Sequence, residues 1–354
     1  MSVAFPRTPD STIDVHAHAW LSELHELVSG REGFRAFTER EIRRSGPESA
    51  LTSTERFTES LPKLTDPDVR IGVMDHAGVD VQVVSVVPTQ YHSWADLPLA
   101  EEITRVTNEG IASHCAAQSD RLCGLGVVPL QHPEHAVEWL EHAVLECGLR
   151  GIEISSYAED PVAGATVELS DHRLDDLWRR AEELEAVVFL HPWDCALEAR
   201  LDRWYLSNSV GQLVEHAVAL SHLIFGGVLD RFPGLRLIAA HGGGFLPVLS
   251  SRNDHAWQVR PESRGCRELP SSYLRRLWFD SVVNTPGALE ALVAAVGADR
   301  VVLGSDHPFD MGTVDPLGLL RQTVPNAQDF AAIAGQNAAR LRLLPGDVTL
   351  DRRP

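Results

Sequence analysis

The sequence predicts an α/β protein, a TIM-type (β/α)8 barrel that forms one domain over residues 1–354, with an insertion after the first strand and a C-terminal helix. Eight short apolar segments alternate with eight helix-like segments along the chain. Most of the apolar segments, such as VQVVSVV and AVVFL, are almost continuously hydrophobic, which is typical of parallel strands buried on both faces. Four of these segments end in histidine or aspartate, where a barrel carries its active site.

The predicted strands are apolar runs bounded by polar or turn-forming residues. They cover residues 12–18, 79–88, 122–130, 151–156, 186–192, 235–243, 277–283 and 301–307. The predicted helices are the helix-like stretches that separate these runs. They cover residues 67–77, 99–117, 133–146, 171–184, 213–229, 245–258, 286–296 and 327–343.

The segment 20–65 lies between the first predicted strand and its helix, and it is too long for an ordinary βα loop. It is rich in Arg, Glu, Ser and Thr. Because βα loops surround the catalytic mouth of a barrel, we expect this insertion to form a lid or small subdomain over the mouth.

The composition argues against polyanionic partners. The chain has 50 Asp and Glu against 31 Lys and Arg, a formal charge of -19, which opposes binding to nucleic acid and to anionic lipid surfaces. The N-terminal stretch lacks the apolar core of a signal peptide, and the sequence holds no run of about 18 apolar residues that could span a bilayer. We therefore expect a cytoplasmic protein with neither nucleic acid nor membrane as a partner.

The five cysteines are odd in number, widely spaced and never arranged as C-x-x-C. This pattern argues against a disulfide framework and against a thiolate zinc site, so we expect small core-filling thiols. They are Cys115, Cys123, Cys147, Cys195 and Cys266.

A metal site is predicted from the residues that close four of the strands. His16 and His18 end the first strand, His191 the fifth, His241 the sixth and Asp306 the eighth. In a barrel these strand ends share one face, and the two side chains of His16-x-His18 project to the same side, about 6.6 Å apart along the strand. His16, His18, His191 and Asp306 can therefore bind one divalent ion and leave a coordination position open. Three nitrogens and one carboxylate favour zinc, with manganese or iron as alternatives.

His241 is open to three interpretations: a fifth ligand, a core histidine, or an acid/base beside the metal. We favour the acid/base, because a neutral imidazole exchanges protons near neutral pH. The string His241-Gly-Gly-Gly also occurs in esterase oxyanion holes, but no serine here lies in a G-x-S-x-G elbow. Histidines on helix-like or loop segments are expected to be solvated or capping side chains, and these are His114, His135, His142 and His216.

The number and position of lysines indicate how many metal ions the site can hold. One large group of metallohydrolases on this barrel bridges two ions with a carboxylated lysine of the fourth strand, but the fourth predicted strand, 151–156, contains no lysine. Lys63 is the single lysine of the chain. A carbamate-bridged pair is excluded, and one ion is expected. Glu153 is a less favoured bridging candidate.

Several motifs together resemble the amidohydrolase superfamily, and within it the metal-dependent decarboxylases typified by aminocarboxymuconate-semialdehyde decarboxylase. The resemblance covers most of the chain, and its most specific parts are HPWD at 191–194, AHGGG at 240–244 and LGSDHPF at 303–309. Further matching segments are DPDVRI at 66–71, VP at 87–88 with Trp94, and FGGV at 225–228.

The resemblance implies roles for named residues. His16, His18, His191 and Asp306 would be zinc ligands, and His241 would activate the water at that site together with Asp306. Trp193 would lie against a planar substrate, and we expect Trp94 and Phe309 to take part in substrate binding as well. Arg260 would reach from a neighbouring subunit to a substrate carboxylate, so a homodimer is expected.

Two positions depart from the family pattern. Thr58 stands where members that act on aminocarboxymuconate semialdehyde carry a second carboxylate-binding arginine, with Arg56 close by, and His307 replaces a usual aromatic residue. The sequence therefore predicts decarboxylation of a small unsaturated or aromatic acid without fixing which acid. Hydrolysis of a lactone, ester or amide, hydration of a double bond, and metal binding without turnover remain alternatives for the same residues.

Overall fold

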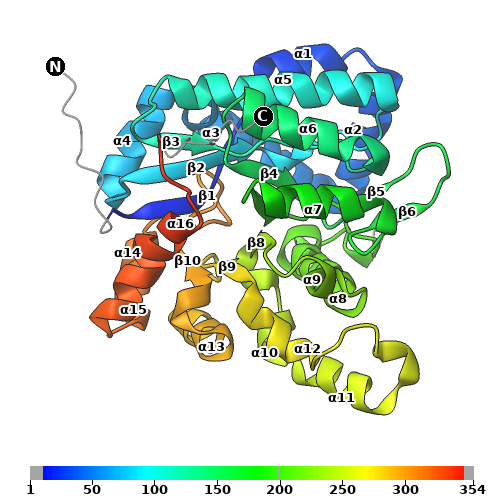
Figure 1. Ribbon diagram of the computed structural model, residues 1–354. Coiled ribbons are helices and arrows are strands. Elements are labelled where there is room, and N and C mark those ends of the chain that lie inside the picture. Colours follow the sequence, from blue (N-terminus) through cyan, green and yellow to red (C-terminus); the bar gives the residue numbers. More distant parts are fainter. Residues whose placement is uncertain (1–10, 198–199, 347–354) are drawn as a thin grey trace.

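The computed structural model describes residues 11–197 and 200–346, and its eight parallel strands confirm the predicted barrel (Figure 1). The numbering omits β5 (Tyr157–Glu159) and β6 (Thr166–Glu168) from the barrel, because these two strands form a separate hairpin. The barrel strands are β1 (Ile13–Ala19), β2 (Val81–Val86), β3 (Leu122–Gly124), β4 (Gly151–Ile154), β7 (Val187–Leu190), β8 (Arg236–Ala239), β9 (Trp278–Asp280) and β10 (Val301–Val302).

Two hydrogen-bonded sheets close into the barrel through isolated contacts. The order β1-β2-β3 forms one sheet and β10-β9-β8-β7-β4 the other, with every neighbouring pair parallel. Parallel bridges between Gly126 and Ile152 and between Ala17 and His307 join their edges. Because the ring is closed, the carboxyl ends of all eight strands face one opening.

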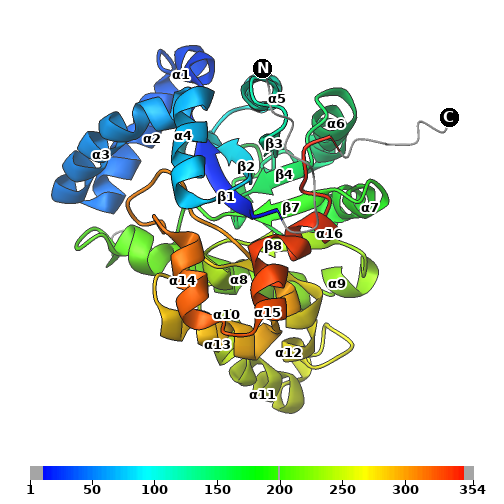
Figure 2. The same cartoon turned by 90° about the vertical axis from the view of Figure 1, so that its left-hand side faces the viewer.

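Helices surround the strands, and Figure 2 shows this ring from the side. Long helices follow the strands where the sequence predicts them, with a cap at several starts; for example, Asp66 accepts a hydrogen bond from the backbone N–H of Asp68 (2.9 Å). The helices after the insertion are α4 (Pro67–Ala77), α5 (Leu97–Ala116), α6 (Ala136–Glu141), α7 (Asp175–Glu183), α8 (Leu213–Phe225), α9 (Val228–Arg231), α10 (Leu246–Leu249), α11 (Ser251–Val259), α12 (Pro270–Tyr273), α13 (Pro286–Val296), α14 (Pro316–Thr323), α15 (Ala327–Ala331) and α16 (Asn337–Arg340).

The structure differs from the predicted elements at several places, of which the following are examples. The predicted strand 122–130 is shortened to β3. The backbone N–H groups of Leu125 and Gly126 still donate to the carbonyls of Val84 and Gly151 (both 2.9 Å), but that of Val127 donates to the Asn108 side chain (2.7 Å). Helix α14 and the antiparallel hairpin β5 (Tyr157–Glu159) and β6 (Thr166–Glu168) are additions. The predicted helix 327–343 is divided by a π-helical turn at Ala332–Gln336.

The insertion consists of three helices, α1 (Ser22–Val28), α2 (Glu32–Ser45) and α3 (Pro47–Thr65), which gather on one side of the barrel in Figure 2. Gly46, between α2 and α3, has a positive φ of 79°, and a Cβ there would collide with the carbonyl oxygen of Asp202 in the segment after β7. Glycine is therefore required where the insertion meets the chain that follows β7.

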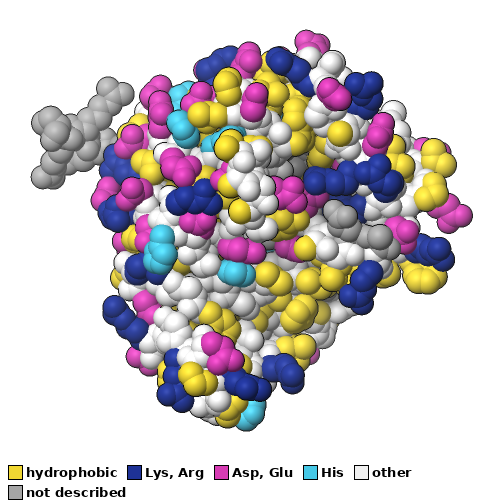
Figure 3. All heavy atoms as spheres, turned by 90° about the vertical axis from the view of Figure 1, so that its right-hand side faces the viewer, with side chains coloured by type: hydrophobic (Ala, Val, Ile, Leu, Met, Phe, Trp, Pro, Cys, Tyr) yellow, Lys and Arg dark blue, Asp and Glu magenta, His cyan; other side chains and the backbone are white. Residues whose placement is uncertain are grey.

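Apolar side chains form an inner and an outer layer. Ile13, Val83, Phe189 and Ile238 belong to the cluster inside the barrel, and a larger cluster lies between the strands and the helices. On the face drawn in Figure 3, acidic and basic side chains are mixed with hydrophobic ones. Among the described residues, no helix is long and apolar enough to span a membrane. Four of the five cysteines are buried, as expected of core-filling side chains, and Cys147 is partly exposed.

Candidate metal centre

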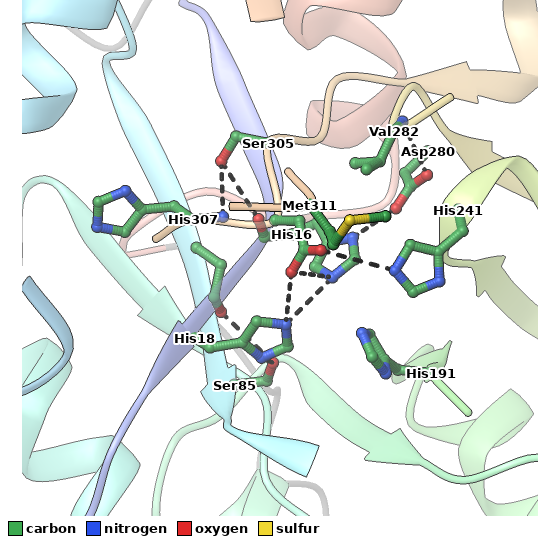
Figure 4. Close-up of polar contacts among 12 residues, drawn as sticks. His16, His18, Ser85, His191, His241, Asp280, Val282, Ser305, His307 and Met311 are labelled. Carbon is green, nitrogen blue, oxygen red and sulfur yellow. Dashed lines mark hydrogen bonds and ion pairs between the residues drawn. The ribbon is translucent and has the colours of Figure 1, made fainter. Parts of the chain in front are cut away.

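The four predicted ligands meet at the carboxyl ends of the strands. One ligand atom from each of His16, His18, His191 and Asp306 lies within 4.8 Å of the others, and all four residues are buried. The Nε2 atoms of His16 and His18 are 3.1 Å apart, and Oδ1 of Asp306 lies 3.4 Å and 3.3 Å from them. Figure 4 shows the three imidazoles pointing toward a common centre. This geometry supports a single divalent metal site.

Each ligand imidazole is oriented through its other nitrogen. Nδ1 of His16 lies 2.6 Å from Oδ2 of Asp280, Nδ1 of His18 lies 3.2 Å from the carbonyl of Val86, and Nδ1 of His191 lies 3.0 Å from the carbonyl of Pro192. Since all three partners are acceptors, each Nδ1 carries the proton and each Nε2 presents a lone pair to the centre. The donor set therefore fits a divalent cation.

Asp306 and His191 have the protonation states that a bound cation requires, whereas His16 binds a proton when no cation is present. The neighbouring histidines hold the pKa of Asp306 well below its usual value although burial opposes them, and burial together with these neighbours holds the pKa of His191 well below its usual value. Asp280 and Asp306 outweigh burial and raise the pKa of His16 to about 9. A bound cation would displace that proton, since metal binding releases protons from its ligands.

The sequence interpretation missed Asp280, which orients His16. Besides holding His16, its Oδ1 accepts hydrogen bonds from the backbone N–H groups of Gly242 (3.0 Å) and Val282 (3.1 Å). Asp280 closes β9, the seventh barrel strand, so the strand-end rule that identified Asp306 could also have found it.

A buried polar chain fixes β1 against the loop that carries Asp306. The Asp14 carboxylate accepts hydrogen bonds from the backbone N–H (2.9 Å) and the hydroxyl (2.5 Å) of Ser305, and from Nε2 of Gln82 (2.8 Å). Arg70 in turn donates to Oε1 of Gln82 (2.7 Å) and to the carbonyl of His18 (2.5 Å). The two strand ends that supply three ligands are thereby held in register.

Glu153 is buried beside the centre but faces the wrong side of His18 to bridge ions. Its carboxylate accepts from the hydroxyls of Ser85 (2.5 Å) and Tyr91 (2.7 Å), and it lies 4.0 Å from Nδ1 of His18, the nitrogen opposite the one that faces the other ligands. Among the described residues, the cluster of His16, His18, His191 and Asp306 is the one group of this kind. The prediction of a single ion agrees with this arrangement.

His241 lies beside the ligands. Its Nε2 is 3.7 Å from Oδ2 of Asp306, and its ring centre is 4.8 Å from that of His191. Nδ1 of His241 lies 3.1 Å from Nε2 of His216, which is fully buried on α8. The expectation that His216 is a solvated or capping side chain is therefore wrong, because the turn after His241 packs against the first turn of α8. Periodicity along α8 places His216 on its inner face, but only the packing of α8 reveals the partner.

The predicted aromatic residues lie in different surroundings. Phe309 is next to the ligands, with its ring centre 5.6 Å from that of His18. Trp94 packs against Gly33 of α2 and stands 5.8 Å from the ring of His92. His307 points away from the ligands in Figure 4.

Arg260 and the region of the expected second arginine lie on the surface. Arg260 is exposed directly after α11, and α11 lies at the periphery of the molecule in Figure 1. Thr58 and Arg56 are exposed on α3, where Arg56 pairs with Glu59 (3.1 Å). The single chain therefore does not bring these arginines together with the ligands.

Arg44 of the insertion binds the segment after His191. Its guanidinium donates to the carbonyl of Trp193 (2.7 Å), to Asp194 (3.0 Å) and to Glu41 (2.6 Å), and it lies 5.1 Å from the centre of the Trp193 ring. Arg40 also pairs with Asp194 (3.1 Å). The side chain of Arg44 is only 6% exposed, so α2 is joined to the HPWD segment by a largely buried ion network.

A closed parallel barrel that gathers three histidines and an aspartate at the carboxyl ends of its strands defines a metal-binding (β/α)8 protein. The chain belongs to the amidohydrolase family, whose model matches residues 13–341. It is 31% identical over 329 residues to a 2-amino-3-carboxymuconate-6-semialdehyde decarboxylase of Dictyostelium discoideum, covering 92% of this chain and 88% of that protein. These findings confirm the resemblance seen in the sequence.

Further similar proteins are also decarboxylases. A gamma-resorcylate decarboxylase of Rhodococcus jostii is 28% identical over 257 residues, covering 69% of this chain and 77% of that protein. The crystal structure of a 2,6-dihydroxybenzoate decarboxylase from Rhizobium shares the fold, with a TM-score of 0.79, 22% identity and coverage of 94% and 98%. A 5-carboxyvanillate decarboxylase from Sphingomonas paucimobilis also shares it, with a TM-score of 0.78, 22% identity and coverage of 94% and 99%.

Replacement of a ligand is expected to empty the site. His191→Ala should weaken divalent-metal binding at least about 100-fold, and Asp280→Asn by about 10–100-fold, because the latter loosens only the orientation of His16. Elemental analysis after dialysis against a metal buffer measures both. His172→Ala, whose side chain is 78% exposed, is the control and should retain about one equivalent, as expected for a mononuclear site. If His191→Ala still bound one full equivalent of metal, the assignment of His191 as a ligand would be contradicted.

Glu41 should make the stability depend on pH. Burial raises the pKa of Glu41 from 4.5 to about 7 despite its pairing with Arg44, while Asp194 raises it further and Arg40 lowers it. The folded protein thus binds this proton more tightly than the unfolded chain, and the stability it contributes below pH 4.5 is lost as the pH rises through about 7.

Urea unfolding between pH 5 and pH 8 tests this effect. The free energy of unfolding should fall over that range by up to about 3 kcal/mol more in the wild type than in Glu41→Gln, since the other titrating groups are common to both. Parallel pH profiles for the two proteins would show that Glu41 is ionised throughout.

Proposed function

We propose that this protein is a metal-dependent non-oxidative decarboxylase of a small unsaturated or aromatic carboxylic acid. The observation that carries the proposal is the convergence of His16, His18, His191 and Asp306 with His241 held beside them. The family membership and the decarboxylase relatives support it. His241 serves as the acid/base in this proposal, with Asp306 as its neighbour.

In such a reaction the residues of the site would have separate roles. A divalent ion in this site would polarise the oxygens next to the departing carboxylate and stabilise the negative charge left by loss of CO2. His241 delivers or removes a proton at Nε2, the atom that faces Asp306. Trp193 and Phe309 orient a planar substrate, and Trp94 supports the wall formed with α2. The burial of the four ligands excludes bulk water from the reacting atoms.

Zinc is the metal we propose, because three imidazole nitrogens and one carboxylate suit it. Manganese is the principal alternative, since a 5-carboxyvanillate decarboxylase from Novosphingobium aromaticivorans, which shares the fold with a TM-score of 0.78, was crystallised in complex with manganese. Elemental analysis of protein purified without added metal, followed by reconstitution with zinc, manganese or iron, decides between them.

The insertion is proposed to act as a lid over the mouth, within a single domain. Its helix α2 contacts the HPWD segment through Arg44, and Gly46 packs against the segment after β7. We further propose a cytoplasmic location, supported by the cysteines of the described residues, none of which forms a disulfide, as is typical of proteins in reducing compartments.

A homodimer is proposed, with Arg260 reaching the neighbouring active site. Four hydrophobic side chains on or beside α10 and α11 are 45–59% exposed, and a second copy of the chain would cover them. They are Phe245, Val248, Leu249 and Val259. Arg260 follows this group directly, and its guanidinium is suited to bidentate binding of a carboxylate.

CO2 release tests the reaction directly. Purified protein is expected to release CO2 from at least one member of a panel of hydroxybenzoates and muconate semialdehydes, and chelation of the metal should abolish turnover. His241→Ala should lower kcat by at least about 100-fold while retaining the metal, because it removes the proton-transfer group but no ligand. Release of CO2 is followed by a coupled assay, and metal content by elemental analysis.

Two outcomes would overturn this assignment. Hydrolysis of lactones or esters in the same panel without CO2 release would indicate a hydrolase, and unchanged turnover in His241→Ala would remove this residue from the chemistry. His255→Ala is a matched control, because His255 is exposed on α11 and should leave kcat unchanged.

Mixed dimers test the role of Arg260. Arg260→Ala and His241→Ala are each expected to be nearly inactive, but a mixture that exchanges subunits should recover up to about a quarter of wild-type activity, because one site of each hybrid then lacks both defects. Arg252→Ala, the other exposed arginine of α11, is tested in parallel. Failure of the Arg260 variant to complement would show that Arg260 does not act across subunits.

A further inference from the structure

His216 and His241 form a hydrogen-bonded pair next to the metal centre. Nε2 of His216 lies 3.1 Å from Nδ1 of His241, and the two rings are inclined at 70° with their centres 5.3 Å apart. The opposite nitrogen of His241, Nε2, faces Oδ2 of Asp306 at 3.7 Å. His216 therefore contacts the edge of the His241 ring that points away from Asp306.

The fold brings His216 to this position through a close contact. Gly244, the last glycine after His241, has a φ of 66°, and a Cβ there would collide with the carbonyl oxygen of Leu213 and lie 3.2 Å from Cβ of His216. The absence of a side chain at Gly244 thus lets the first turn of α8 approach His241. Part of the HGGG motif is explained by this approach.

His216 is an uncharged hydrogen-bonding group. Its exposure is 0%, and burial, reinforced by His241 and His16, holds its pKa well below the usual value. Nδ1 of His216 has no hydrogen-bond partner among the described residues. A neutral imidazole donates through one nitrogen and accepts through the other, so the proton on His216 determines which direction the bond to His241 takes.

The direction of this bond follows from what His241 must do. To take a proton from the metal side, His241 needs a free lone pair on Nε2, and its own proton must then lie on Nδ1. That Nδ1–H can only donate to Nε2 of His216, which must be the acceptor. When His241 gains a proton on Nε2, the bond from Nδ1–H to His216 stays in place, so the ring need not turn during the reaction.

We propose that His216 is a positioning residue that holds His241 in the Nδ1–H tautomer by accepting a hydrogen bond on Nε2. This inference rests on the proposed role of His241 as acid/base. In the same centre His16 is held by the carboxylate of Asp280 (2.6 Å) and the other two ligand imidazoles by backbone carbonyls, whereas His241 is held by a second imidazole. A neutral acceptor orients the imidazole without adding a full negative charge beside it.

Four variants separate positioning from simple packing. His216→Gln can still accept through its side-chain carbonyl at the place of Nε2, His216→Leu fills the space without an acceptor, and His216→Asn is polar but too short to reach. His222→Leu is the matched control, because His222 lies on the same helix, is 37% exposed and bonds Ser170 (2.9 Å) instead of His241.

The decisive measurement is the tautomer of His241, read from the nitrogen NMR signals of protein labelled at histidine. The signals of His241 are assigned by their loss in His241→Ala. Wild type, His216→Gln and His222→Leu should carry the proton on Nδ1, and His216→Leu and His216→Asn should show a mixture of tautomers. The spectra are recorded with and without one equivalent of zinc, and they need no substrate.

Turnover provides the second measurement. The kcat of His216→Leu should fall about 10–100-fold with KM within about 2-fold, since an orienting partner is lost but no binding group. His216→Gln should recover kcat to within about 3-fold of wild type. A purely structural role would instead lower kcat in proportion to the loss of folded protein, which the melting temperature reports.

Two results would overturn the proposal: a wild-type His241 that carries its proton on Nε2, or a His216→Leu variant that keeps the Nδ1–H tautomer and the wild-type kcat. If His216→Leu does not fold, His216→Asn decides in its place. If no acid in the panel is decarboxylated, the proposed function fails, but the tautomer comparison still decides whether His216 orients His241.

Discussion

The structure depends on the burial of charged and ionisable groups at one end of the barrel. Asp306 lies between the Nε2 atoms of His16 and His18 at 3.3–3.4 Å, in surroundings that exclude almost all water. Buried charge of this kind is stable only when it is paired and hydrogen-bonded, so every neighbouring group is constrained by it. A divalent cation would complete the pairing, which explains why three separate segments of the chain converge here.

The groups around the ligands fix their orientation through further hydrogen bonds. Asp280 fixes the tautomer of His16, and Asp14 fixes the loop of Asp306 through Ser305. Backbone carbonyls orient the remaining ligands. His241 differs from the ligands because its outer partner is the imidazole of His216 (3.1 Å). Arg44 extends the same principle to the insertion, where a buried ion network joins α2 to the segment that follows His191.

Much of the site was predictable from local signals at the strand ends. His16, His18, His191 and Asp306 could be found because closure of a parallel barrel carries every strand end to one face, whatever the sequence separation. Asp280 obeys the same rule and could have been found with them. Periodicity places His216 on the inner face of α8, but its contact with His241 could not be predicted, because that contact depends on how α8 packs against the turn after His241. The ends of strands also could not be predicted from the hydrophobic pattern, because side chains such as Asn108 replace backbone hydrogen-bond partners there.

The sequence by itself determined the fold class and the residues that meet at the candidate metal site, because hydrophobic periodicity and residue type at strand ends are local properties that do not depend on the arrangement of the loops. The family followed from the resemblance of motifs such as HPWD and AHGGG. Only the tertiary structure decided which nitrogen of each imidazole faces the centre, that Glu153 faces away from the ligand atoms, and that His216 contacts His241. Those features depend on distances of a few ångströms between segments far apart in sequence, and such distances are set by the packing of helices on the closed barrel.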